Sequence, residues 1–297
     1  MHVMMAPMTW RGVAKGVAVL AAMTTLAGCS WRLETEPEAF RTPSPVTIVR
    51  DQLAAAEGAV ESAASAGDDA LAQAERDAAP VRVAALGGVS PTSAPRAADD
   101  LEAAIASARD AALACMGAAG DDPLAGLCAS IALSHEVMST AADPLTIADA
   151  GYGSGPDTLP GADTEVSTAE LSELALAHDQ LGALYEVVAA RGTDGAREVA
   201  LTRSASERAR AKALLAIDGV SDLTQPQYDI PTDAGAPLAA ELTIAQRYAA
   251  ALVDAAPRDR LWLYNSAVAA YAQAIVNGLA PGDVPALPGA TTVPAPQ

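Results

Sequence analysis

The sequence predicts an all-α protein, and three observations support this fold class. Alanine is abundant, while aromatic residues make up only 3% of the chain. The core therefore has to be built from Leu, Val, Ile and Ala, which suit helices packed closely together. Several long segments also place apolar residues three and four positions apart, the spacing of one helix face, and Gly- and Pro-rich stretches separate them. We expect an N-terminal helical hairpin or bundle module followed by a C-terminal four-helix bundle.

The first 28 residues have the pattern of a secretory signal peptide. Two basic residues and no acidic ones precede an apolar run at 16–26, which is about half the length needed to cross a bilayer. The run ends in Leu26-Ala27-Gly28-Cys29, which resembles the lipobox of bacterial lipoproteins. This resemblance implies cleavage before Cys29 and attachment of diacylglycerol to its sulfur. The alternative is an ordinary signal peptide followed by an incidental cysteine.

A lipid anchor on Cys29 would fix the location of the mature protein. Two or more acyl chains hold a protein stably on a bilayer. We therefore expect membrane lipid to be a partner through the acylated Cys29, with the protein on the extracytoplasmic face of the cell membrane. Residues 29–45 contain several prolines and mixed charges, and they read as a tether.

The net charge of the chain argues against nucleic acid as a partner. The formal charge is −19, and removal of residues 1–28 takes away two cations and no acidic residue, which leaves −21. Binding to phosphates needs a basic face, so no nucleic-acid partner is expected. An acidic body also repels anionic lipid, which leaves attachment to the acyl chains. Other cell-envelope proteins are the remaining class of partner.

The N-terminal module is predicted to occupy residues 46–142. Its first helical pattern runs from about 46 to 78 and is broken or softened near Gly67, and a connector follows at 80–95. Two further helices are predicted at about 96–116 and 123–140. The short turn between them, which contains Pro123, makes this pair a helical hairpin.

Cys115 and Cys128 both belong to this hairpin. Each lies on the apolar face, five residues from the turn, so antiparallel helices place the two cysteines at similar heights. Because an exported protein can be oxidised, we predict a Cys115–Cys128 disulfide. Two buried reduced thiols are the alternative.

Residues 143–166 are rich in Gly, Pro and Asp, and they are predicted to be a linker between two domains. The second domain spans residues 167–279 and carries four helical patterns, which begin near 167, 194, 237 and 257. A connector of some 18 residues at 218–236 can extend about 60 Å, more than the length of a helix. It therefore allows the second and third of these helices to run parallel, as a long crossover requires. The tail at 280–297 has many prolines and no period, which predicts disorder.

Residues 171–279 resemble the ferritin-like domain of actinobacterial lipoproteins of unknown function (the DUF4439 group). The resemblance is carried by Ala-Leu-Ala before Asp179-Gln180, by the Arg-rich second helix, by Tyr228-Asp-Ile-Pro231 and by the segment from Glu241 to Tyr248. It implies a ferritin-like four-helix domain. Members of the group have Glu-His where this chain has Asp179-Gln180, so a ligand role does not carry over to that position.

Neither a metal nor another cofactor is expected. Di-iron bundles use two Glu-x-x-His motifs, whereas His135 and His178 each follow an alanine at the position three residues earlier. Both histidines lie on apolar faces and are expected to be partly buried and hydrogen-bonded across the bundle. A weaker hypothesis groups His178, Asp179, Tyr185 and Glu186 as an altered bundle site, although Asp179 and Glu186 also fit a solvated helix edge.

The sequence also contains no recognisable catalytic motif. No Gly-x-Ser-x-Gly, phosphate loop or Cys-x-x-Cys occurs, and the glycines at 151–155 read as linker because no strand precedes them. The leading hypothesis is a non-enzymatic, membrane-anchored scaffold or interaction module. The second is a small-ligand binder with a cavity in the bundle, which the small-residue face of the helix at 194–217 (Val199, Thr202, Ser206, Ala209, Ala213, Ile217) would line. A metal-dependent oxidoreductase rests on the analogy of fold alone.

Overall fold

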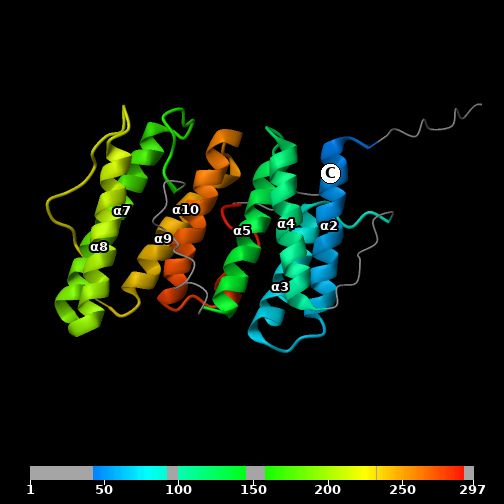
Figure 1. Ribbon diagram of the computed structural model, residues 1–297, viewed down its shortest axis with the longest axis horizontal. Helices are drawn as coiled ribbons and strands as arrows, with labels where there is room; N and C mark the ends of the chain where they lie inside the picture. The colour runs from blue at the N-terminus through cyan, green and yellow to red at the C-terminus, as the bar shows by residue number, and fades with distance from the viewer. Residues whose placement is uncertain (1–42, 92–99, 145–157, 232, 291–297) are drawn as a thin grey trace, which may run out of the picture. The chain divides into compact units, whose positions relative to one another are not determined.

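The computed structural model describes residues 43–91, 100–144, 158–231 and 233–290, and these residues form helices and connecting loops without any β-strand (Figure 1). The all-α fold class is confirmed. The described residues from Ser44 onward belong to one compact unit. The α-helices of the described residues are α2 (Pro45–Ala64), α3 (Ala70–Ala85), α4 (Leu101–Ala119), α5 (Leu124–Ala142), α7 (Thr168–Arg191), α8 (Asp194–Leu215), α9 (Ala236–Val253) and α10 (Pro257–Val276).

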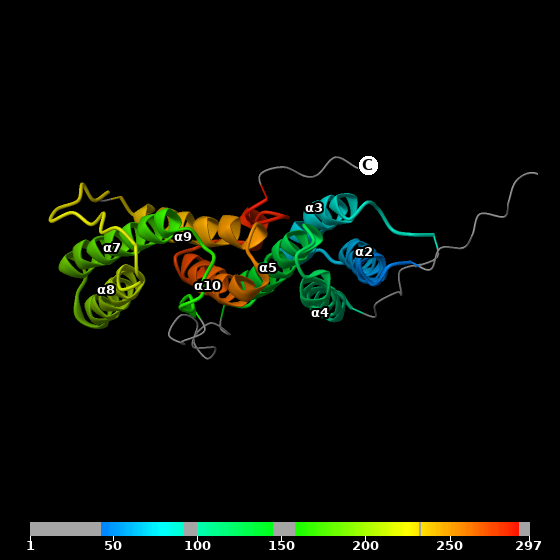
Figure 2. The same ribbon diagram turned by 90° about the horizontal axis from the view of Figure 1, so that it is seen from above.

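Helices α2 to α5 pack side by side in the N-terminal half (Figures 1 and 2). Helix α2 packs against α3 and α4, and α5 packs against α4 and α3. The predicted break near Gly67 is confirmed, because α2 ends before Gly67 and Asp69 caps a new helix by accepting a hydrogen bond from the amide of Ala72 at 2.7 Å. The expected connector at 80–95 was wrong in its first part. Helix α3 continues to Ala85 with Pro80 on its exposed side, where water can satisfy the carbonyl that proline leaves unpaired.

A disulfide joins Cys115 of α4 to Cys128 of α5, as the sequence predicted. The two Cα atoms are 5.9 Å apart, and both side chains are fully buried. The two cysteines are 13 positions apart in the sequence, so the disulfide closes a short loop. In the chain-entropy description, a loop of this size stabilises the fold by about 3 kcal/mol.

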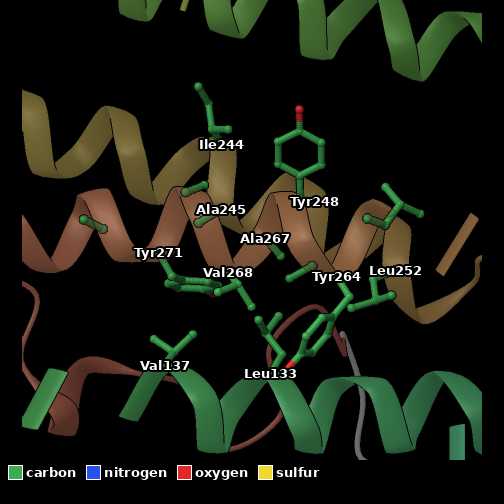
Figure 3. Packing of buried hydrophobic residues seen from close by; sticks show 14 of the residues in the cluster. Leu133, Val137, Ile244, Ala245, Tyr248, Leu252, Tyr264, Ala267, Val268 and Tyr271 are labelled. Carbon is green, nitrogen blue, oxygen red and sulfur yellow. The ribbon is translucent and has the colours of Figure 1, made fainter. Parts of the chain in front are cut away.

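Helix α5 also packs against the C-terminal half of the chain. Figure 3 shows Leu133 and Val137 of α5 facing Tyr264, Val268 and Tyr271 of α10, and all five side chains belong to one buried cluster. The segments before and after the predicted linker at 143–166 therefore share a core and are not separated by it.

At its other contact, α5 lies so close to the end of α9 that only a glycine fits. A Cβ atom added to Gly126 would lie 1.9 Å from the carbonyl oxygen of Val253. The absence of a side chain at Gly126 thus sets how closely the two halves approach.

The four C-terminal helices run in the order that the long crossover allows. Figure 1 shows the connector between α8 and α9 returning along the helices, so that α8 and α9 run parallel. Helix α7 packs against α8 and α9, and α9 packs against α10. Among the described helices, however, α8 packs extensively only against α7. The seam between α8 and α10 is therefore not closed by direct helix packing, while α5 occupies the other side of α9 and α10.

The predicted disorder at 280–297 was wrong for residues up to 290. A short 3₁₀ turn (Pro281–Asp283) packs against α3 and α5, and Val284 and Leu287 are buried. Ser130 of α5 donates a hydrogen bond to the carbonyl of Pro288 at 2.7 Å. The segment has no helical period because it is held by separate side-chain contacts.

Several predictions concern residues outside the described ranges. They are the signal peptide, Cys29, nearly all of the tether, most of the linker (145–157) and the last residues of the tail (291–297). Within the described ranges, no helix combines the length and the apolar composition that crossing a bilayer requires.

Candidate functional site

The open seam between α8 and α10 forms a groove near Val199 and Val276. Farther along the same helices, Thr158 bridges the seam. Its hydroxyl accepts a hydrogen bond from Arg210 of α8 at 2.6 Å, and its carbonyl accepts one from Ser266 of α10 at 2.8 Å. The groove of about 830 Å³ lies between α7, α8 and α10 among the described residues. This volume is in the range of small-molecule sites.

The walls of the groove are largely apolar. They include Val188 of α7, Val199 and Ala200 of α8, and Val276 of α10. Val199 and Val276 expose 71% and 62% of their surfaces, and both valines lie on the same groove. Exposed apolar side chains gathered around a concavity are a feature of binding sites.

The inner end of the groove is polar and is organised around Glu241 of α9. Arg203 of α8 donates to the Glu241 carboxylate through Nε at 3.2 Å and through Nη2 at 3.1 Å. Tyr185 of α7 donates its hydroxyl proton to Oε1 of Glu241 at 2.9 Å and accepts a hydrogen bond from Asn277 of α10 at 3.0 Å. Glu241 itself is fully buried, whereas Arg203, Tyr185 and Asn277 line the groove.

A second carboxylate continues this network into the core. Glu207 of α8 forms an ion pair with Nη2 of Arg203 at 2.7 Å and accepts a hydrogen bond from Nδ1 of His178. Nε2 of His178 lies 2.7 Å from the hydroxyl of Tyr248 on α9. Because Nδ1 carries the proton that faces Glu207, a neutral His178 accepts a hydrogen bond from the hydroxyl of Tyr248 at Nε2.

Burial and pairing set different protonation states for the two carboxyls. Burial raises the pKa of Glu241 to about 7, an effect that Arg203 opposes and the charge of Glu207 reinforces. Burial also disfavours the charged form of Glu207, but His178 and Arg203 outweigh it and lower the pKa of that carboxyl. Burial lowers the pKa of His178. Near neutral pH, Glu241 is thus the group of this network that gains or loses a proton.

The structure separates the four residues of the predicted bundle site into two networks. His178 and Tyr185 point into the core and are linked through Glu207, Arg203 and Glu241, as described above. Asp179 and Glu186 lie on one edge of α7, where both pair with Arg208, at 2.8 Å and 2.9 Å. Tyr228 of the crossover also donates to Asp179 at 2.7 Å. Asp179 and Glu186 therefore belong to an ion-pair network that connects α7 with α8 and with the crossover.

The small-residue face of α8 lines the groove only in part. Val199, Thr202 and Ser206 are among the lining residues, as predicted, whereas Ala209 is exposed and does not line it, and this face is not the buried face of the helix. The buried face carries Ala200, Ser204, Glu207, Ala211 and Leu214. A charged residue on a buried face breaks the apolar pattern from which helix orientation is read, because its pairing with His178 and Arg203 replaces apolar contact.

Sequence reasoning also missed a second buried polar cluster, which lies in the N-terminal half. Glu57 of α2, Glu75 and Arg82 of α3 and His135 of α5 are all 0% exposed. His135 contacts Glu57 at 2.6 Å and Glu75 at 3.1 Å, and Arg82 pairs with both carboxylates, at 2.7 Å to Glu57. The two cations balance the two anions.

The protonation states of this cluster follow from its contacts. Burial opposes the charged forms, yet His135 and Arg82 lower the pKa of Glu57 to about 2. Although burial also opposes the imidazolium, Glu57 raises the pKa of His135. Both ring nitrogens of His135 face carboxylates, which requires two N–H donors and hence the charged form. The cluster is a closed ionic core without a free ligand position, and we assign it a structural role.

Across the described residues, no group of three or more His, Cys, Asp or Glu side chains has an arrangement that could hold a metal ion. The groove therefore remains the strongest candidate site, with apolar walls, a guanidinium and a proton-exchanging carboxyl at its inner end. Comparisons with protein-family models, with curated proteins and with solved structures gave no match.

Proposed function

We propose that the protein is a lipoprotein anchored through Cys29 on the extracytoplasmic face of the cell membrane, where its helical body serves as a non-enzymatic scaffold or interaction module. The observation that carries the anchor is Leu26-Ala27-Gly28-Cys29 at the end of a short apolar run. The Cys115–Cys128 disulfide supports export, since such bonds persist in oxidising compartments. It also occupies the other two cysteines of the chain, which leaves Cys29 to carry lipid.

Metabolic labelling with an alkyne fatty acid tests the anchor. The wild-type protein should take up the label and sediment with membranes, and Cys29→Ser should lose both properties. A Cys115→Ser/Cys128→Ser double variant is the matched control and should keep the label. Labelling that persists in Cys29→Ser would refute the anchor, and surface proteolysis of intact cells would report the face on which the body lies.

A second candidate function, binding of a small ligand, is favoured by the groove between α8 and α10. Its volume, its exposed valines and its polar inner end together match the usual composition of a ligand site. The resemblance to the ferritin-like domain supplies no ligand set for this position. Native mass spectrometry of protein purified from its own cells would test this function, because a retained small molecule would add a discrete mass to the chain.

A further inference from the structure

We propose that the groove between α8 and α10 binds one amphiphilic carboxylate, with its chain against the valines and its head on Arg203, and that Glu241 is protonated in the bound state, so that binding takes up as much as one proton. This inference rests on the second candidate function, ligand binding in the groove, and names the class of ligand. It is independent of the lipid anchor.

The position of Arg203 determines the charge of the ligand head. Its side chain is 17% exposed and lines the groove, and its Nε and Nη2 are engaged by Glu241 and Glu207. Nη1 has no hydrogen-bond acceptor among the described residues. Because guanidinium groups form strong charge-assisted hydrogen bonds with carboxylates, a ligand carboxylate fits this position. Val188, Val199 and Val276 line the same groove and suit an alkyl chain.

The carboxylates that already surround Arg203 would repel a bound carboxylate, and protonation of one of them would remove part of this repulsion. A bound carboxylate would be the third anion around one guanidinium, after Glu207 and Glu241. The groups that face Glu241 are Arg203 and Glu207 from α8 and Tyr185 from α7, while the α10 residue Asn277 reaches it only through Tyr185. The lowered pKa of Glu207 keeps that residue charged.

Glu241 is therefore the anion that can be neutralised. It is fully buried and its pKa is about 7, so a proton is available to it at neutral pH. Proton uptake restores the charge of the site to its value before binding, and Arg203 then pairs with the ligand in place of one of its two carboxylates. Glu198, an exposed residue that also lines the groove, adds a weak, solvent-screened repulsion.

The pH dependence follows from this exchange. A ligand that binds only when Glu241 is protonated loses affinity as pH rises through 7. With a pKa of about 7, the affinity should fall about tenfold between pH 6 and pH 8. Glu241→Gln keeps the shape of the protonated acid, and it should bind the same carboxylate with little change over that range.

Calorimetric titration of three probes with the same chain tests the proposal. The protein is the mature chain, residues 29–297, with Cys29→Ser so that no acyl chain competes, and the probes are decanoate, 1-decanol and decyltrimethylammonium. Decanoate should bind one to one, about tenfold or more tighter than decanol, and the cation should bind weakest. Arg203→Gln should remove the advantage of decanoate. Arg208→Gln, on the same helix but outside the groove, is the matched control and should retain it.

Each contrary result would refute a separate part of the proposal. Equal affinity for all three probes would overturn recognition of the head while leaving ligand binding in place. Tightest binding of the cation would overturn the role of Arg203. Equal decanoate affinity at pH 6 and pH 8 would overturn the proton uptake. Absence of binding by every probe would overturn the inference, whereas the second candidate function fails only if native mass spectrometry also finds no retained molecule. The comparison of probes on the unsubstituted groove decides the matter even if Arg203→Gln fails to fold.

Discussion

Replacement of Glu57 by Gln should remove a large and pH-dependent part of the stability of the N-terminal half. Glu57 has a pKa of about 2 in the fold, against an ordinary value of 4.5. This difference corresponds to about 3 kcal/mol of stability. Because the folded pKa is lowered, the contribution is present above pH 4.5 and is lost as pH falls toward 2. The substitution also leaves the cations of Arg82 and His135 with only Glu75, and breaking a buried ion pair costs about 3–5 kcal/mol.

Urea unfolding followed by circular dichroism at pH 7, 5 and 3 measures this effect. The free energy of unfolding of Glu57→Gln should lie at least about 3 kcal/mol below wild type at pH 7 and 5, and the gap should shrink by more than half by pH 3. Glu61→Gln, at an exposed position of the same helix, is the control and should stay within about 0.5 kcal/mol of wild type. A gap that is small at pH 7, or that is unchanged at pH 3, would refute the ionic cluster.

Two further predictions concern the packing of α5. Gly126→Ala should destabilise the protein by about 1–3 kcal/mol, because its Cβ would collide with Val253. Gly117→Ala in α4, where a Cβ meets no atom within 4 Å, should stabilise it by about 0.5–1 kcal/mol; equal effects in chemical unfolding would contradict the close approach of α5 and α9. Ser130→Ala should cost about 1 kcal/mol and increase proteolysis after Pro288, since the hydrogen bond that holds the tail is lost. Unchanged proteolysis would argue against an ordered tail.

Much of the fold could be predicted from the sequence, because most helices here have an apolar face at regular spacing and clear end signals. Helices α7 and α10 begin within about a residue of their predicted starts near 167 and 257. The disulfide followed from the position of both cysteines on apolar faces at equal distances from one turn, together with the expected export. The length of α3 could not be predicted, because proline inside a helix is tolerated only where the surroundings are exposed. The packing of α5 on α10 depends on contacts distant in sequence, which periodicity does not report.

The candidate site was harder to predict, because its central residues are charged. Glu241 stands four residues before Ala245 and seven before Tyr248, on the buried face of its helix, so the spacing already indicated that Glu241 could be buried. A glutamate at such a position is ordinarily read as exposed. His178 and Tyr185 were identified from the apolar face of α7, but their partners on α8 and α9 required the three-dimensional arrangement.

The titration of Glu241 tests most directly whether a buried carboxyl, hydrogen-bonded to Arg203 and Tyr185, lies at the inner end of the groove. Carbon-13 NMR of protein labelled at the glutamate side-chain carboxyl, with Glu241→Gln to assign the resonance, would follow it directly. The geometry predicts a midpoint near pH 7 in the free protein and a higher one when decanoate saturates the groove. A midpoint near 4.5, unaffected by decanoate, would mean that the carboxyl is solvated and would contradict the account.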